Sequence, residues 1–164
     1  MTDHHIDNFN SQTYGVMDLP KLVTQIQKFI RAENNSHFRV VVGTDSELTG
    51  EKRAHFVTAV VVHHVGHGGI YFWSSLTKDN IATMRDRIYE EATYSLTTAQ
   101  RLIDEFHRQK LPLEDILEIH VDVGEVGETR TLIAEVVGMV KGSGFVCKTK
   151  PESFGASNVA DRHT

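Results

Sequence analysis

Residues 38–46 read FRVVVGTDS, and the organisation of the chain can be worked out from this stretch in both directions. Phe38 to Val42 is a short, apolar, β-branched run, which predicts a strand in the centre of a sheet. An acidic residue, Asp45, follows directly within Gly43-Thr44-Asp45-Ser46. Ligands of open α/β sheets bind at the carboxyl ends of strands, so Asp45 is a candidate site residue. The alternative is a turn aspartate that accepts hydrogen bonds from nearby backbone N–H groups.

Two more strands are predicted after this one. Ala54 to Val62 is rich in valine, and Ile70 to Trp73 begins a third apolar run. The segments between these runs are short and contain glycine, at Gly50 and within residues 63–69. Three strands joined by short turns predict an antiparallel meander.

Helices are predicted before and after the meander. Asp18 suits an N-cap and Pro20 suits the first turn, so an N-terminal helix is expected from there to the polar run at residues 33–36. A long helix is expected over residues 80–109, with Pro112 beyond its end. Its apolar stripe consists of Ile81, Met84, Ile88, Ala92, Leu96, Ala99, Leu102, Ile103 and Phe106.

The rest of the chain alternates between strand and helix. A fourth strand is predicted over residues 116–123, a second long helix over 128–141, a fifth strand over 145–148 and a last helical turn over 157–163. A meander followed by this alternation predicts an α/β fold: a mixed sheet of five strands with helices on both faces, plus the N-terminal helix. We expect one domain over residues 18–164, preceded by a flexible leader at 1–17.

Composition limits the compartment and the partners. The single cysteine, Cys147, excludes an internal disulfide and a cysteine-based zinc site, which favours a reducing compartment. Residues 1–10 lack the features of a signal peptide, and no apolar stretch is long enough to span a bilayer. We therefore expect a cytoplasmic protein without a membrane partner. No organic cofactor is expected either, since the glycines at 68–69 and 142–144 lack the lysine and Ser/Thr of a phosphate loop.

The net charge of −5 argues against tight binding of nucleic acid through its phosphates alone. A metal-dependent nuclease can nevertheless be acidic, because bound cations invert the local field at a carboxylate cluster.

Two further carboxylates extend the candidate site. Asp122 lies between Val121 and Val123, whose side chains should face the other side of the sheet. A strand aspartate is costly to bury unless it is paired or coordinates a cation. If the first and fourth strands are neighbours, Asp45 and Asp122 approach each other, and their repulsion gives a reason to expect a metal ion. Glu91 lies beside the apolar stripe of the long helix; its alternatives are a pair with Arg87 on the helix surface, or Glu90 as the site residue.

The C-terminal residues are less distinctive by themselves. Asp161 lies near the end of the chain, where charged residues are usually solvated. Lys148, Lys150, Arg162 and His163 could bind a phosphate, and His163 could protonate a leaving group; the alternative is a solvated basic cluster.

Taken together, the pattern is more specific: a strand aspartate, a glutamate on the helix after a three-stranded meander, an aspartate on the fourth strand and a late acidic residue. The motifs are Gly43-Thr44-Asp45-Ser46, His120-Val121-Asp122-Val123-Gly124, Val137-Gly138 with Gly142-Ser143-Gly144-Phe145, Lys150-Pro151-Glu152-Ser153 and Ala160-Asp161-Arg162. This set resembles the ribonuclease H-like superfamily, and more closely its YkuK-type family of bacterial proteins, over about residues 18–164.

The resemblance implies hydrolysis of phosphodiester bonds with two metal ions. Asp45 would bridge two Mg²⁺ or Mn²⁺ ions about 4 Å apart, with Glu91, Asp122 and Asp161 completing the oxygen ligands. The substrate would be RNA, an RNA–DNA hybrid or structured DNA. The chain shows no basic or aromatic insertion that could grip such a substrate, so the alternative is a non-catalytic module that binds nucleic acid or a protein partner. A nucleotide phosphatase or kinase-like relative is disfavoured by the small size of the chain. The oligomeric state stays open.

Overall fold

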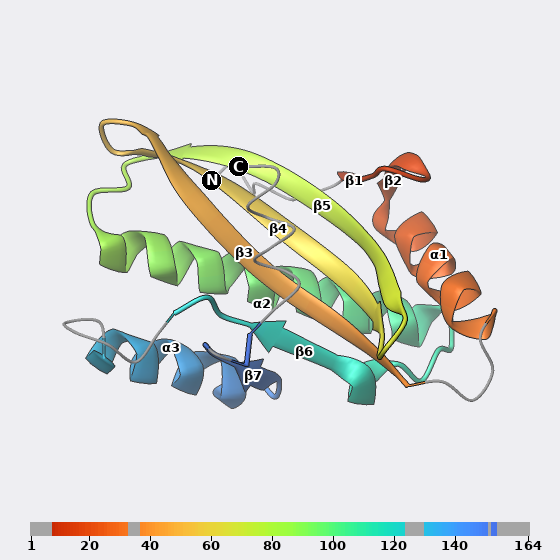
Figure 1. Ribbon diagram of the computed structural model, residues 1–164. Helices are drawn as coiled ribbons and strands as arrows, with labels where there is room; N and C mark the ends of the chain where they lie inside the picture. Colours follow the sequence, from red (N-terminus) through yellow and green to blue (C-terminus); the bar gives the residue numbers. More distant parts are fainter. Residues whose placement is uncertain (1–7, 33–36, 124–129, 151, 154–164) are drawn as a thin grey trace.

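The computed structural model describes residues 8–32, 37–123, 130–150 and 152–153. The sheet within these ranges has seven strands in the order β2-β1-β5-β4-β3-β6-β7 (Figure 1). The predicted meander is present as β3, β4 and β5, which pair antiparallel, and β6 and β7 join beyond β3 as parallel strands. The strands are β1 (Asn8–Ser11), β2 (Gly15–Asp18), β3 (Phe38–Gly50), β4 (Arg53–His64), β5 (Gly68–Asp79), β6 (Leu117–His120) and β7 (Val146–Lys148).

The prediction of five strands is wrong, because the sheet has two more strands, β1 and β2, which form a hairpin. Its residues were assigned to a flexible leader, but β1 pairs antiparallel with β2 and, at Asn10 and Trp73, with β5. Phe9 on β1 is fully buried in the main core, and Met17 on β2 is nearly so. Phe9 is the one apolar residue of β1, and Val16 and Met17 are adjacent on β2, so neither strand shows a period-two pattern; the edge of β5 provides the pairing that places them in the sheet.

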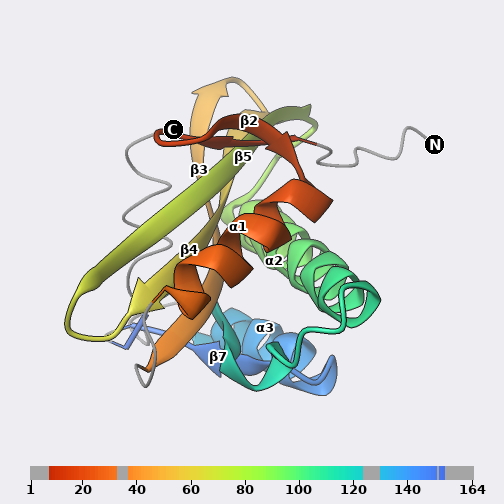
Figure 2. The same ribbon diagram turned by 90° about the vertical axis from the view of Figure 1, so that its right-hand side faces the viewer.

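The helices are α1 (Leu19–Arg31), α2 (Met84–Arg108) and α3 (Arg130–Gly142), with a short 3₁₀ helix at Glu114–Ile116. α2 lies between α1 and α3 and contacts both. Figure 2 shows α1 and α2 side by side on the same side of the sheet. One core cluster contains apolar residues of all three helices together with Val40 and Val42 of β3. The described helices therefore cover one face, whereas helices on both faces were predicted.

The burial of β3 on both faces explains that error. Val41 is as inaccessible as Val40 and Val42, although it belongs to a separate small cluster with Ala59, Val61 and Tyr71 on the other face. A strand that is apolar on both faces does not tell which face carries the helices.

Helix caps fix where two helices begin. Asp18 accepts a hydrogen bond from the Lys21 backbone N–H at 3.0 Å, and Pro20 lies in the first turn of α1, as predicted. α2 begins at Met84 rather than near Asn80, because Thr83 and Asp86 form a capping box there. No helix in the described ranges is long and apolar enough to cross a membrane.

Candidate functional site

The candidate site lies where β3 and β6 part. Their parallel ladder runs from the pair Val40–Leu117 to the pair Gly43–His120. Continuing this register by two residues sets Asp45 opposite Asp122. The first and fourth predicted strands are thus neighbours, which was the condition for the two aspartates to approach each other. Val121 and Val123 are buried in the main core on either side of Asp122, so the partly exposed carboxylate is directed away from that core.

Asp45 lies within a strand and not in a turn after one. β3 continues to Gly50, and Asp45 pairs with Val57 of β4 in the ladder. One carboxylate oxygen of Asp45 accepts a hydrogen bond from the Ser46 backbone N–H at 2.9 Å. The alternative of a simple turn aspartate is therefore wrong, although the expected bond to a backbone N–H is present.

Glu91 reaches the site from α2. Its side chain is 8% exposed, and it accepts a hydrogen bond of 2.5 Å from the Ser46 hydroxyl. Arg87, one turn earlier on α2, donates to the same hydroxyl at 3.1 Å and to the Ser46 carbonyl at 2.7 Å. Ser46 is therefore held between the arginine and the glutamate, and its hydroxyl proton is directed to Glu91.

The three candidate carboxylates line one cavity of about 250 Å³. Asp45, Glu91 and Asp122 all line it, with Arg87 and Met84 on its helical side. Three acidic side chains from β3, α2 and the segment after β6 thus share one cavity. Glu90, the alternative on the helix, does not line this cavity and instead forms an ion pair with Lys78 at 2.6 Å.

The environment raises the pKa of Glu91 to about 7. Burial is the main cause, since it disfavours the charged carboxylate, and the negative charges of Asp45 and Asp122 add to the rise. The hydrogen bond from Ser46 and the charge of Arg87 act in the opposite direction. A cation in the cavity would offset the negative charges of Asp45 and Asp122, which contribute the smaller part of this rise in pKa.

Asp122 has a cation beside it already. Lys150 Nζ lies 3.0 Å from Asp122 Oδ1, whereas Lys148 pairs with Glu152 at 3.6 Å. Lys150 is held beside Asp122 by the backbone, because its N–H donates to the Val123 carbonyl at 3.3 Å. The two lysines are thus paired with acidic residues and do not form a separate basic cluster.

The donor chemistry of the cavity fits a hard divalent cation such as Mg²⁺ or Mn²⁺, because carboxylate oxygens are the ligands these ions prefer. Within the described ranges, however, no three His, Cys, Asp or Glu side chains are gathered closely enough to hold an ion. Each of the three carboxylates already has a polar contact: Asp45 with the Ser46 backbone N–H, Glu91 with the Ser46 hydroxyl and Asp122 with Lys150. A metal ion would compete with Lys150 for the Asp122 carboxylate, whereas Glu91 can accept from Ser46 through one oxygen and ligate through the other.

Asp161, Arg162 and His163, and with them the predicted helical turn over 157–163, lie outside the described residues. The roles of Ser46 and Arg87 toward Glu91 were not predicted. Arg87 was considered only as a surface partner of Glu91. Its position four residues before Glu91, on the same side of the helix, is the signal that could have indicated a shared target. Met84 was placed in the buried stripe, but it is 61% exposed at the rim of the cavity.

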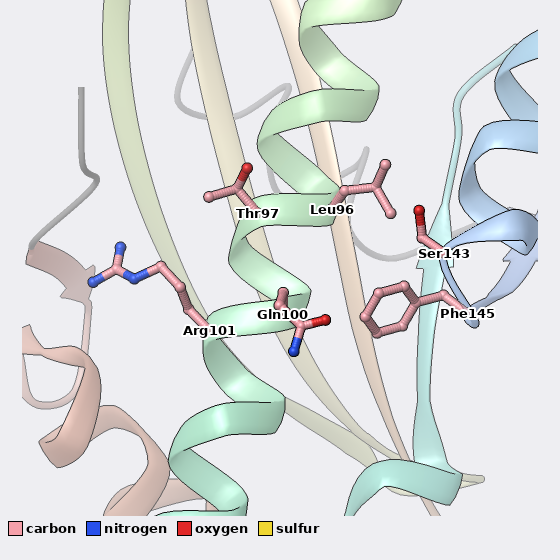
Figure 3. A pocket seen from close by; sticks show the side chains of 6 residues that line it. All are labelled: Leu96, Thr97, Gln100, Arg101, Ser143 and Phe145. Carbon is pink, nitrogen blue, oxygen red and sulfur yellow. The ribbon is translucent and has the colours of Figure 1, made fainter. Parts of the chain in front are cut away.

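Away from this site, a hollow of about 390 Å³ lies between α2 and the turn after α3 (Figure 3). Leu96 and Gln100 of α2 point toward Ser143 and Phe145 in that view, while Arg101 points away from them. The hollow has no carboxylate among its lining residues, and it lacks the paired acid groups that distinguish the Asp45 cavity.

The described part of the chain is thus a mixed α/β protein with an acidic cavity between two parallel neighbouring strands and a covering helix. The family model described as Ribonuclease H-like matches residues 21–164, and the chain belongs to this family. The resemblance inferred from the motifs is confirmed. The chain is similar to the uncharacterized protein YkuK of Bacillus subtilis (strain 168), with 28% identity over 169 residues, covering 95% of this chain and 96% of that protein. No solved structure matches the chain.

Proposed function

We propose that this protein is a divalent-metal-dependent nuclease that hydrolyses phosphodiester bonds in RNA, an RNA–DNA hybrid or structured DNA. One observation carries the proposal: Asp45, Glu91 and Asp122 come from three separate elements and line a single cavity. The repulsion among these acids contributes to the raised pKa of Glu91. Clustered carboxylates whose pKa is raised by their surroundings are typical of functional sites.

Asp45, Glu91 and Asp122 would hold Mg²⁺ or Mn²⁺, and Asp161, outside the described residues, would complete the ligands. A pair of such ions supplies an activated water and stabilises the leaving oxygen of the phosphodiester. Ser46 would keep the Glu91 side chain oriented toward the cavity through its hydroxyl. Arg87 lines the same cavity, and Lys150 forms an ion pair with Asp122, which also lines it. Both side chains would therefore be near enough to bind a substrate phosphate.

The positive charges of Arg87 and Lys150 matter because the chain as a whole is acidic, with a net charge of −5. A nucleic acid would meet little general attraction, so its phosphate would be bound by cations within the site and by the metal.

A second candidate function is a non-catalytic module that binds nucleic acid or a protein partner. The contacts of Glu91 with Ser46 and of Asp122 with Lys150 favour it, because they satisfy both carboxylates without a metal ion.

Two measurements separate the candidates. Calorimetric titration with Mn²⁺ should give binding to the wild type that is lost in Asp45→Asn and in Asp122→Asn. Cleavage of labelled RNA, hybrid and branched DNA should require Mg²⁺ or Mn²⁺, should be abolished in the same two variants and should be weakened in Asp161→Asn. Asp104→Asn is the matched control, since Asp104 is exposed on α2 and bonded to Gln100. Cleavage retained by both Asn variants would exclude this metal site, whereas absence of Mn²⁺ binding up to millimolar concentration would favour the non-catalytic module.

A further inference from the structure

A second hollow lies beside the acidic cavity. This neighbouring hollow has a volume of about 510 Å³, and Met84 and Arg87 line both. It lies between the end of the β3–β4 hairpin and the beginning of α2, with Leu48 and Lys52 on the hairpin side and Ile81 before the helix. A ligand that extends out of the acidic cavity past Arg87 would therefore enter it.

Part of the wall of this second hollow is formed by apolar side chains. Leu48 is 52% exposed and Met84 is 61% exposed, which makes them two of the most exposed large apolar side chains in the described residues. Ile81, by contrast, is buried and packs with Phe56. Exposed apolar side chains beside a polar site are a recognised mark of a binding surface.

The second hollow is also preformed. The Ile81 backbone N–H donates to the Lys52 carbonyl at 2.9 Å, which ties the segment before α2 to the hairpin turn. The capping box of Thr83 and Asp86 fixes the first turn of α2, on which Met84 lies. Asp86 accepts the backbone N–H groups of Ala82 and Thr83, and the Thr83 hydroxyl accepts that of Asp86, so these three N–H groups are already bonded. The basic side chains that line the hollow are those of Arg87 and Lys52, and Glu51 in the hairpin turn is its acidic one.

We propose that this second hollow, defined by Leu48, Ile81 and Met84, binds the unpaired base of the nucleotide next to the scissile phosphate. This inference rests on the proposed nuclease function and narrows its substrate to nucleic acid that is single-stranded at the cleavage site. Arg87, on the wall shared by the two hollows, is placed to bind the phosphate that joins the nucleotide in one to the nucleotide in the other. The charged side chain of Arg87 would thus contact the phosphate, and the neighbouring apolar side chains would contact the base attached to it.

Base pairing would prevent this binding. A base in a duplex is stacked and paired, and it reaches a side hollow only when it is unpaired or flipped out. Single-stranded substrates present their bases without that cost. RNA and DNA share this chemistry, so both belong in the test.

The test is a binding measurement without cleavage. Fluorescence anisotropy in Ca²⁺ would follow a labelled single-stranded oligonucleotide, a set of versions each lacking one base, and the corresponding duplex, as DNA and as RNA. For the wild type, removal of one particular base should weaken binding roughly 5-fold, in proportion to the apolar area buried. In Met84→Gln and in Leu48→Thr, removal of that base should have no further effect. Val16→Thr removes an apolar side chain that is 68% exposed on β2 and serves as the control.

The outcomes distinguish the two proposals. A wild-type protein that binds single strands and duplex equally, or that loses no affinity at any missing base, would overturn the inference on the second hollow while leaving the nuclease proposal intact. Equal sensitivity to the missing base in Met84→Gln and in wild type would overturn it as well. Failure of the wild type to bind any nucleic acid, together with absence of Mn²⁺ binding, would overturn the nuclease proposal itself. Thermal melting of each variant would confirm that it is folded.

Discussion

Lys150 Nζ lies 3.0 Å from Asp122 Oδ1, at a place where the proposed function requires a divalent cation. The lysine side chain is 57% exposed and the aspartate side chain 23% exposed, so water screens their attraction. Exposed ion pairs contribute about 0.2–1 kcal/mol. The ammonium group is thus a weak counterion, which a metal ion with two positive charges can displace.

Lys150→Gln is expected to strengthen binding of Mn²⁺ by roughly 2- to 5-fold, which corresponds to losing a competing ion pair of this size. Isothermal calorimetry measures the change. Lys148→Gln is the matched control, because Lys148 lies on the same segment but pairs with Glu152. Weaker Mn²⁺ binding in Lys150→Gln would show that Lys150 supports the ion and does not compete with it.

Ser46→Ala is expected to raise the pKa of Glu91 further above about 7, because the hydrogen bond from Ser46 favours the ionised carboxylate. Titration of the glutamate side-chain carboxyl by ¹³C NMR measures this pKa directly. Ser95→Ala removes a buried hydroxyl that bonds Thr44, so it should leave the pKa of Glu91 unchanged. An unchanged pKa in Ser46→Ala would mean that Ser46 does not donate to Glu91.

Phe9→Ala is expected to destabilise the protein by about 3–5 kcal/mol, as the loss of a fully buried aromatic side chain does. Urea unfolding monitored by circular dichroism gives the free energy of unfolding. Tyr14→Ala in the β1–β2 turn, where the side chain is 45% exposed, should cost far less. Equal stability of Phe9→Ala and wild type would be the result expected of a flexible leader, and would contradict the hairpin.

The meander and the helix–strand alternation could be predicted because their apolar patterns are long and regular. β4 and β5 each pair along nearly their whole length with the neighbouring strand, and local sequence is sufficient to indicate such pairing. The hairpin β1–β2 has four-residue strands with little apolar pattern, and it depends on β5 for its place in the sheet. Nothing in residues 8–18 alone contains that information.

The site could be predicted to a similar extent. Asp45, Glu91 and Asp122 were selected because a carboxylate beside buried apolar residues needs a reason to be there. The contacts of Ser46 and Lys150 were beyond such reasoning. Both contacts join residues that are distant in the sequence; Ser46 and Glu91, for example, are 45 positions apart. The Ser46–Glu91 contact depends on how α2 crosses β3, and the Lys150–Asp122 contact depends on the pairing of β6 with β7.

Glu91 should make the stability of the folded protein fall with rising pH. Its pKa rises from 4.5 to about 7 on folding, so the folded state binds this proton more tightly than the unfolded state. The stabilisation is therefore complete below pH 4.5, is lost between about pH 4.5 and pH 7, and does not change above that. A shift of this size corresponds to about 3 kcal/mol.

Glu91→Gln keeps a neutral side chain at every pH. At pH 5 the variant and the wild type should have similar free energies of unfolding, and at pH 8 the variant should be more stable by up to about 3 kcal/mol. Urea unfolding at several pH values measures the difference, with Glu90→Gln as control because Glu90 pairs with Lys78 outside the cavity. Saturating Mn²⁺ should restore the stability of the wild type at pH 8 and not that of Glu91→Gln to the same degree, since a cation stabilises the ionised glutamate. A wild type whose stability did not fall between pH 5 and pH 8 relative to Glu91→Gln would show that Glu91 ionises at an ordinary pKa, and neither burial nor the charges of Asp45 and Asp122 would then raise it.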